Sequence, residues 1–417
     1  MDKIVIIGGN ELNGSVEISG AKNAVLPVMA ATLLAPGEYR ISRVPNLRDT
    51  RTMIKLLKLI GAEVSFDDGL VTIDTGGCDN PEAPYELVKT MRASFYVLGP
   101  LLSRFGYARV SLPGGCAWGP RPVNFHVSAV KALGAETSLE EGYVVAKGEK
   151  LYGNTIDFDK SSVGATGNAV MAAVRAEGET VVKNAACEPE IVTLCDFINA
   201  MGGQVSGMGS DTIKIRGVES LQAVDFGIIP DRIEAATFLI AGAMIGDTVS
   251  VLGVIPDHIA GVIERLNDAG NDITIGTDSV TLKRGERIRP VDVTTSIYPG
   301  FPTDVQAQWM ALMALADGNA TIVDTIYQDR FTHVAELSRL GARIELEGNN
   351  ARVYGTGQLI GAPVMSTDIR ASASLIIAGL AAEGRTDISR VYHIDRGYEN
   401  IEDKFRALGA EIWRESE

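Results

Sequence analysis

Cysteine and histidine are scarce in this chain, since each occurs only four times among 417 residues. The cysteines form no CxxC pair, and none lies at zinc-ligand spacing from a histidine. They are Cys78, Cys116, Cys187 and Cys195. The scarcity argues against a disulfide framework and a zinc site. We expect reduced thiols, no metal and no other cofactor, and a hydrogen-bonding role within the fold for His126 and His333.

Positive charge is also in short supply, because 38 Lys and Arg residues against 53 Asp and Glu residues leave a net charge of −15. Nucleic acid and anionic membranes would repel such a chain, so neither is an expected partner. Long apolar runs are missing too. The stretch 236–245 is too short to cross a bilayer, and the first residues, MDKIVIIGGN, do not resemble a signal peptide. We expect a cytoplasmic protein that binds small-molecule substrates and has no obligate protein partner.

Phosphate-binding glycine motifs are a further absence. The chain contains no GxxxxGK(S/T), and no GxGxxG between a predicted strand and a predicted helix. P-loop chemistry and dinucleotide chemistry are therefore not supported. An anionic substrate would have to be held by individual Lys and Arg side chains.

Two phrases recur six times along the chain. The first is an apolar helix-like stretch, a glycine stop and an alternating strand, and glycine suits the left-handed conformation that ends a helix. Its glycines recur at intervals of about 70 residues: Gly61, Gly134, Gly202, Gly270, Gly341 and Gly409. The second phrase is a polar start before a helix rich in small residues. Its polar residues are Lys22, Arg92, Ser162, Asp231, Asp304 and Asp368.

The repeats predict an α/β fold of six units, each with two helices, an inner strand and a two-stranded hairpin. Six units divide into two groups of three. We expect one domain over 22–229 and a discontinuous one over 1–21 and 230–417, with the active site in the cleft between them. The segment 3–19 has no unit of its own and is expected to pair with the sheet of the last unit.

Function is expected where the units carry different polar residues at equivalent places. Lys22, Arg92 and Arg370 add positive charge at the starts of leading helices, where unpaired N–H groups and the helix dipole already favour an anion. The two arginines have an alternative role as partners in ion pairs. Aspartates stand at three of the starts, and helix capping alone would explain each of them: Asp231, Asp304 and Asp368.

The loops from the inner strand to the trailing helix are the second such place. The loop 113–122 is rich in Gly and Pro and carries Cys116 close to Arg121, which would lower the pKa of the thiol. A lone cysteine is otherwise an inert small hydrophobe. Arg396 lies in the corresponding loop of the last unit. With the charged helix starts, these loops predict a cleft for a multiply anionic substrate, with Cys116 and Asp304 as acid and base candidates.

Six short motifs, spread over the whole chain, resemble those of the enolpyruvyl transferases, in particular those that act on UDP-N-acetylglucosamine. They are ISGAKNA (18–24), KTMRAS (89–94), SLPGGC (111–116), GFPTD (300–304), TDIRAS (367–372) and HIDRGYE (393–399). The resemblance implies the fold of that family, an inside-out α/β barrel of six βαβαββ units in two three-unit domains.

The resemblance also implies an activity, the transfer of the enolpyruvyl group of phosphoenolpyruvate to the 3-hydroxyl of UDP-N-acetylglucosamine with release of phosphate. This is the first committed step of peptidoglycan precursor synthesis. The reaction needs an acid and a base, and the resemblance assigns these roles to Cys116 and Asp304. For phosphoenolpyruvate it implies contacts from Lys22, Asn23, Arg121, Arg370 and Arg396. For the nucleotide sugar it implies contacts from Arg92, Arg121, Pro122, Val123, Asn124, Phe125, Lys160, Ser161, Ser162, Val163, Asp304 and Ile326.

Two other functions stay open. An enzyme like 5-enolpyruvylshikimate-3-phosphate synthase shares the fold and the chemistry, but typically has Ser-Lys-Ser where this chain has Ala-Lys-Asn at 21–23. A noncatalytic nucleotide-sugar-binding paralogue would need neither Cys116 nor Asp304. The thiol predicts covalent inactivation by fosfomycin, whose epoxide it would open. The chain departs from the family at 124–125, where Asp-Leu is common, and at 328–329, where Glu-Asn is common.

Overall fold

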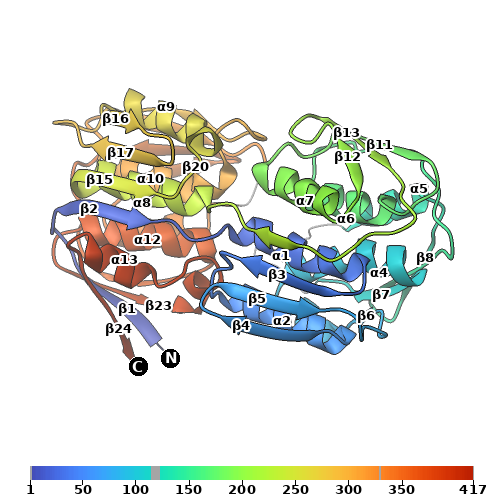
Figure 1. The fold of residues 1–417 in the computed structure, drawn as a ribbon. Helices are drawn as coiled ribbons and strands as arrows, with labels where there is room; N and C mark the ends of the chain where they lie inside the picture. The colour runs from blue at the N-terminus through green and yellow to red at the C-terminus, as the bar shows by residue number, and fades with distance from the viewer. Residues whose placement is uncertain (1, 114–122, 328–329, 417) are drawn as a thin grey trace. The chain divides into compact units, whose positions relative to one another are not determined.

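The computed structural model describes residues 2–113, 123–327 and 330–416, which form six four-stranded sheets with helices packed against them (Figure 1). All six sheets share one pairing pattern. An edge strand runs parallel to the strand beside it, and that strand pairs antiparallel with one strand of a hairpin or its equivalent. The α/β class with six repeated units is confirmed.

The chain divides into two compact units, Gly20–Ile229 and Met1–Ser19 with Pro230–Glu417. The unit Gly20–Ile229 holds three sheets, whose strands in spatial order are β14 (Asp225–Gly227), β3 (Glu38–Ser42), β5 (Leu70–Asp74) and β4 (Glu63–Asp67); β6 (Glu82–Ala83), β7 (Tyr107–Ser111), β9 (Tyr143–Lys147) and β8 (Glu136–Glu140); and β10 (Thr155–Asp157), β11 (Glu179–Lys183), β13 (Thr212–Arg216) and β12 (Gln204–Ser206). Its helices are α1 (Lys22–Ala31), η1 (Thr32–Leu34), α2 (Arg48–Ile60), α3 (Tyr85–Val88), η2 (Arg92–Val97), α4 (Leu98–Phe105), α5 (Asn124–Ala132), α6 (Val163–Ala173) and α7 (Pro189–Ala200).

The other unit is built in the same way. Its sheets are β16 (Asp272–Ile275), β17 (Ser279–Lys283), β15 (Gly246–Leu252) and β2 (Leu12–Glu17); β18 (Val293–Thr294), β19 (Asn319–Val323), β21 (Asn350–Tyr354) and β20 (Arg343–Glu347); and β22 (Pro363–Met365), β23 (Arg385–Ser389), β1 (Asp2–Ile7) and β24 (Glu411–Ser416). Its helices are α8 (Arg232–Ile245), η3 (Pro256–Ile259), α9 (Ala260–Asp268), η4 (Thr303–Val305), α10 (Gln306–Ala314), α11 (Val334–Arg339), α12 (Ile369–Ala381), η5 (Val391–Arg396) and α13 (Ile401–Ala407).

The leading helices form the inside of this unit. α8, α10 and α12 pack against one another, and α8 and α12 are buried on nearly every side because their sequences are apolar all round. Small residues let neighbours approach closely: a Cβ at Gly242 of α8 would lie 3.0 Å from Cβ of Val249 in β15. Helices at the centre with sheets around them give the predicted inside-out arrangement.

The six repeat glycines end their helices as expected. Each has a positive φ, between 93° at Gly341 and 111° at Gly61. At Gly61 the N–H donates to the carbonyl of Lys58 over 3.1 Å, and the next N–H, of Ala62, donates to Leu57 over 3.0 Å. These bonds satisfy the last carbonyls of α2 and turn the chain into β4.

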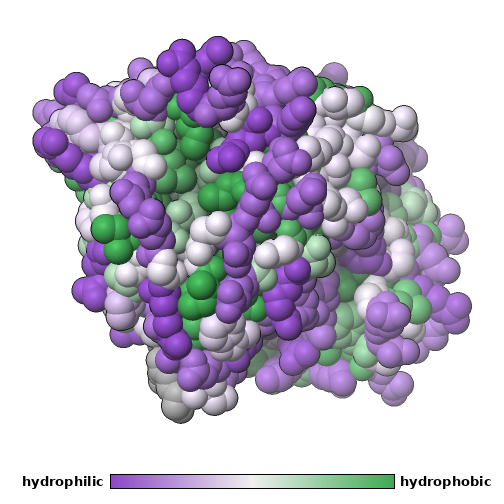
Figure 2. All heavy atoms as spheres, turned by 90° about the vertical axis from the view of Figure 1, so that its left-hand side faces the viewer, coloured by the Kyte–Doolittle hydropathy of each residue, from purple (hydrophilic) through white to green (hydrophobic). Residues whose placement is uncertain are grey.

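The N-terminal segment joins two sheets. β1 pairs antiparallel with β23 and β24, which confirms the expected pairing with the last unit, whereas β2 runs parallel to β15 in another sheet. Among the described residues, no helix is both long and apolar enough to cross a membrane. Figure 2 shows one face, on which hydrophobic side chains form small patches separated by hydrophilic ones.

Candidate functional site

Lys22 begins α1 and is held by a buried carboxylate. Its Nζ lies 2.8 Å from Oδ2 of Asp49 in the first turn of α2, where the Asp49 side chain is only 3% exposed. No side chain caps α1, because the residue before it is Ala21. An ammonium group beside an uncapped helix start favours an anion, and the half-buried Asn23 follows directly. Asp49 was missed from the sequence because an acid in a first helical turn is ordinary.

Arg92 begins η2, and its charge acts on His126. Burial and the positive charge of Arg92 lower the pKa of His126 to about 3, so the ring is neutral near pH 7. The side-chain amide of Asn168 donates to Nδ1 of His126 over 2.8 Å, and the Phe95 ring meets the imidazole edge-on. The predicted hydrogen-bonding role of His126 is confirmed.

Two segments predicted to line the nucleotide-sugar site come together in the structure. α5 packs against α6, and a Cβ at Gly164, in the first turn of α6, would lie 3.0 Å from Cε1 of His126 in the first turn of α5. Phe125, next to Val123 and Asn124, has its ring centre 5.9 Å from that of Phe158, which precedes the segment 160–163. Within that segment, Ser161 to Val163 are half-buried and Lys160 is exposed.

Five residues with an expected role lie outside the described residues: Cys116, Arg121, Pro122, Gln328 and Asp329. The described members of the predicted site therefore consist of one group on α1, η2, α5 and α6, and a second group in the other unit.

Asp304 is the centre of the second group and joins two arginines. Its Oδ1 lies 2.6 Å from Nη2 of Arg330, and its Oδ2 lies 2.7 Å from Nη2 of Arg370. The side chains of Arg330 and Arg370 are 9% and 8% exposed, whereas the Asp304 side chain is 25% exposed. Each carboxylate oxygen thus has its own buried cation, and the carboxylate keeps one open side.

Asp304 does not cap its helix, so the capping alternative is wrong for this residue. No side-chain cap is present at η4 or at α10, which follows it. The alternative is right for Asp231 and Asp368. Oδ1 of Asp231 accepts from the second and third N–H groups of α8, and Oδ1 of Asp368 accepts from the corresponding groups of α12.

Charge decides the protonation state of Asp304. Burial by itself raises the pKa of the carboxyl group, but the positive charges of Arg370 and Arg330 outweigh burial and hold the pKa well below its usual range. Burial lowers the pKa of Arg370, and the charge of Asp304 more than offsets that effect. The three groups are therefore ionised together near neutral pH.

Thr303 and Asp324, which were not assigned a role from the sequence, help to hold Arg330 in place. Nη1 of Arg330 donates to Oγ1 of Thr303 over 2.9 Å, and this hydroxyl donates to Oδ2 of the fully buried Asp324 over 2.8 Å. Ile326, predicted to contact the nucleotide sugar, lies two residues after Asp324 and is 37% exposed. Only the position of Asp324, directly after an inner strand, marked it in the sequence.

Arg370 lies beside the ring of a buried tyrosine, Tyr398. The Arg370 guanidinium carbon lies 5.9 Å from the centre of the Tyr398 ring, and the Tyr398 hydroxyl forms a 2.8 Å hydrogen bond with Thr237. Arg396 ends η5, two residues before Tyr398, and is half-buried. The structure therefore gathers Asp304 and Arg370 into one cluster and carries Arg396 on the adjoining helix.

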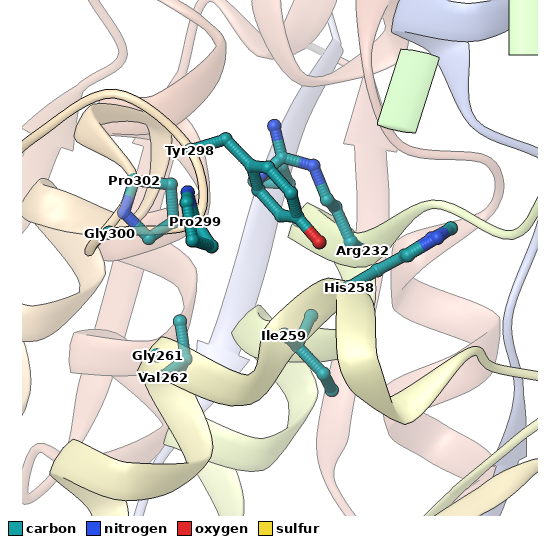
Figure 3. A pocket seen from close by; sticks show the side chains of 10 residues that line it. Arg232, His258, Ile259, Gly261, Val262, Tyr298, Pro299, Gly300 and Pro302 are labelled. Atoms are coloured by element: carbon teal, nitrogen blue, oxygen red, sulfur yellow. The ribbon is translucent and has the colours of Figure 1, made fainter. Parts of the chain in front are cut away.

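A hollow of about 240 Å³ lies beside the segment that leads to Asp304. Figure 3 shows the Arg232 side chain next to the ring of Tyr298, with the guanidinium carbon 5.5 Å from the ring centre, and His258 on the same rim. None of the predicted site residues lines this hollow. Among the described residues, no group of three His, Cys, Asp or Glu side chains could hold a metal ion.

Comparison with known proteins gives consistent matches. A model of the family described as EPSP synthase (3-phosphoshikimate 1-carboxyvinyltransferase) matches residues 6–405. The UDP-N-acetylglucosamine 1-carboxyvinyltransferase of Chlorobaculum parvum is 55% identical over 100% of this chain and 99% of that protein. The protein of the same name from Geotalea uraniireducens is 53% identical, and each covers 100% of the other.

Solved structures show the same architecture. The enolpyruvyl transferase NikO from Streptomyces tendae matches with a TM-score of 0.89 and 29% identity, covering 99% of this chain and 98% of that one. An EPSP synthase from Acinetobacter baumannii matches with a TM-score of 0.77 over 100% of both chains. At 20% identity, the second match shows the fold alone.

Proposed function

The chain belongs to the enolpyruvyl transferase family, and on that premise we propose that it transfers the enolpyruvyl group of phosphoenolpyruvate to the 3-hydroxyl of UDP-N-acetylglucosamine. Phosphate is the second product, and the product nucleotide sugar would serve peptidoglycan synthesis. The observation that carries the proposal is the cluster of Asp304 with Arg330 and Arg370. It offers a carboxylate for a hydroxyl group and buried positive charge for an anion at one helix start.

The chemistry requires an addition and an elimination. In the addition, the sugar oxygen attacks C2 of phosphoenolpyruvate, Asp304 takes the hydroxyl proton, and Cys116 gives a proton to the methylene carbon. In the elimination, the bond from C2 to the phosphate oxygen breaks and phosphate leaves, while the methyl carbon formed in the addition returns a proton to the Cys116 thiolate; this restores the double bond and the thiol. The roles of Asp304 as base and Cys116 as acid are carried over from the family resemblance, and the presence of both residues argues against a binding protein without catalytic activity, which would need neither.

The anionic groups of phosphoenolpyruvate are assigned to Lys22, Asn23, Arg121, Arg370 and Arg396. The uncapped start of α1 and the ion pair that fixes Lys22 support this assignment. Cationic groups placed before the reaction stabilise charge that develops in the transition state, without having to reorganise.

Arg370 has two expected tasks, and they are linked. Its charge now depresses the pKa of Asp304, which makes the carboxylate a weak base. When phosphoenolpyruvate binds to Arg370, the negative charge of the substrate offsets part of the positive charge that acts on Asp304. The pKa of Asp304 then rises, and the carboxylate becomes a better proton acceptor. Binding of the anion thus prepares the base.

The nucleotide sugar is assigned to the segments that pack at the starts of α5 and α6, with Arg92, Asp304 and Ile326. The residues of this set are Arg92, Arg121 to Phe125, Lys160 to Val163, Asp304 and Ile326. The proposed substrate contacts thus draw on both units, Gly20–Ile229 and Met1–Ser19 with Pro230–Glu417, and domain motion accompanies binding in this proposal. We place the reaction in the cytoplasm, where the Cys116 thiol stays reduced.

The deciding assay is phosphate release from phosphoenolpyruvate with alternative acceptors. We expect release with UDP-N-acetylglucosamine and none with shikimate 3-phosphate. Release only with shikimate 3-phosphate would assign the chain to the EPSP synthase activity instead. Release with neither acceptor would favour a nucleotide-sugar-binding paralogue.

Fosfomycin offers a separate test of Cys116. We expect the intact protein to gain the mass of one fosfomycin molecule and to lose activity, because the thiolate opens the epoxide. The matched control is Cys116→Ser, and the described cysteines have raised pKa values through burial, so they should not react. An adduct that persists in Cys116→Ser would refute the assignment.

A further inference from the structure

A buried carboxylate, that of Asp324, lies next to the Asp304 cluster and is not itself assigned to either substrate. Asp324 follows β19 and is fully buried. Its Oδ1 accepts from the Thr295 hydroxyl over 2.9 Å and from the N–H groups of Ile326 and Tyr327 over 2.9 and 3.0 Å. Its Oδ2 accepts from the Thr303 hydroxyl over 2.8 Å. One oxygen shapes the loop, and the other points toward the helix start that carries Asp304.

The direction of the hydrogen bonds through Thr303 is fixed. A guanidinium group can only donate, so the Thr303 oxygen must accept from Arg330. The single hydroxyl proton therefore points at Asp324, whose carboxylate can only accept. Arg330 thus donates on one side to Asp304 and on the other to Thr303, which donates to Asp324; we call this set of four groups the relay.

A second contact leads from Asp324 to the same arginine. The N–H of Tyr327 is bound by Asp324, and the Tyr327 ring centre lies 5.3 Å from the guanidinium carbon of Arg330. Arg330 is therefore held by a hydroxyl on one side and an aromatic ring on another, and Asp324 positions both.

We propose that Asp324 is a positioning residue, which acts through Thr303 and the Tyr327 loop to hold Arg330 against Asp304. The inference rests on the proposed function for the role of Asp304 as the base. It gives the two arginines different tasks. Arg330 is anchored by the relay and stays with Asp304, whereas Arg370, which comes from α12 and is hydrogen-bonded to Tyr398, serves the substrate anion in this proposal.

Other charged groups around the cluster have to be considered before a pH profile is interpreted. Arg330 and Arg370 face Asp304 itself. The charges of Asp368, Arg330 and Asp324 act on His333, and burial lowers the pKa of His333 to about 4. Near Arg370 are Asp231 and Tyr398, and burial raises the pKa of the tyrosine. His333 and Tyr398 are therefore neutral near pH 7.

Asp324→Asn is a selective test of the relay. The remaining carbonyl oxygen can keep the three bonds to Thr295 and the loop, whereas the new NH₂ group faces Thr303. That NH₂ group and Arg330 would then both donate to one hydroxyl oxygen, so the anchoring bond weakens. Asp292→Asn is the matched control, because the exposed Asp292 accepts an N–H bond from Thr321 on the same sheet and has no link to Arg330.

We expect Asp324→Asn to lower kcat about 10- to 100-fold, the usual effect of losing a partner that orients a functional group, with the KM for the nucleotide sugar changed less than about threefold. Thr303→Val should lower kcat by a similar factor. Thr303→Ser, which keeps the hydroxyl group, should retain most of the wild-type kcat. Asp292→Asn should behave like the wild type. A kcat within about twofold of the wild type in both Asp324→Asn and Thr303→Val would overturn the proposal.

A ¹³C NMR titration of the Asp304 carboxyl carbon gives a readout that does not depend on turnover. The Asp304 signal is the one that is absent from the spectrum of Asp304→Asn. A loosened Arg330 should raise the pKa of this carboxyl group in Asp324→Asn and Thr303→Val. An unchanged titration in both variants would refute the relay even if kcat fell. If Asp324→Asn did not fold, Thr303→Val would decide. A wild-type chain that released no phosphate would refute the proposed function, whereas the titration would still test the relay.

Discussion

The start of α10 and the starts of α8 and α12 occupy equivalent places in three repeats, yet their aspartates bind different partners. Asp231 and Asp368 accept from N–H groups two and three residues later, as helix caps do. Asp304 binds Arg330 and Arg370, which are 26 and 66 residues away. The same residue type is therefore structural where only backbone donors reach it, and chemically distinctive where two buried cations do.

The difference at these helix starts also shows how a repeat acquires a function. A capping aspartate can be diverted only if its helix tolerates the loss of the cap, and α10 is preceded by the short helix η4, whose own turn opens the helix. The N–H of Val305 then donates to the backbone carbonyl of Pro302. At this start a backbone carbonyl accepts from an early N–H group, whereas at α8 and α12 the side chains of Asp231 and Asp368 do so.

Neutralising the aspartate at the start of α10 and at the start of α8 should give the largest difference between the two sites, measured as kcat. We expect Asp304→Asn to lower kcat for phosphate release about a thousandfold, because the amide cannot accept the hydroxyl proton. The affinity for the nucleotide sugar should change only a few-fold. Asp231→Asn should leave kcat within about twofold, because asparagine caps helices about as well as aspartate. Equal losses in the two variants would mean that Asp304 is structural as well.

Lowering the pH should remove the contribution of Asp304 to the free energy of unfolding. At pH 7 we expect Asp304→Asn to reduce the free energy of unfolding by about 2 kcal/mol, the scale of hydrogen bonds to charged groups. The folded pKa of Asp304 is depressed, so this contribution is complete above the unfolded pKa of about 3.9 and is lost as the pH falls through the folded value.

Urea unfolding of wild type and Asp304→Asn at several pH values measures this effect. The gap between the two proteins should be constant from pH 7 to about pH 5 and should narrow below about pH 4. A gap that stayed constant down to pH 3 would contradict the ion-pair origin of the low pKa. Asp231→Asn serves as the control, with a small gap at every pH.

Removal of a cap should give the smallest effect. We expect Asp368→Ala to reduce the free energy of unfolding by about 1 kcal/mol, and Asp368→Asn by a few tenths, because asparagine restores the acceptor. Urea titration at pH 7 compares the two. An alanine variant as stable as the wild type would show that α12 does not depend on this cap.

Much of this protein could be predicted from local sequence. The glycines from Gly61 to Gly409 marked six helix ends, because a left-handed residue after a helix is a local requirement that glycine meets best. Lys22 and Arg370 were singled out as positive charges at two predicted helix starts, where a substrate anion could bind. Asp304 was singled out, but its sequence neighbours were equally consistent with a cap.

Only the tertiary structure decided which partners these residues have. Asp49 and Asp324 sit in ordinary local contexts, the first turn of a helix and the end of a strand, and their partners Lys22 and Thr303 are more than 20 residues away in the sequence. Capping involves donors two or three residues away, so the sequence by itself restricts it to a few positions. An ion pair such as Asp304 with Arg370 joins residues from different repeats, and it exists because α10 and α12 pack side by side.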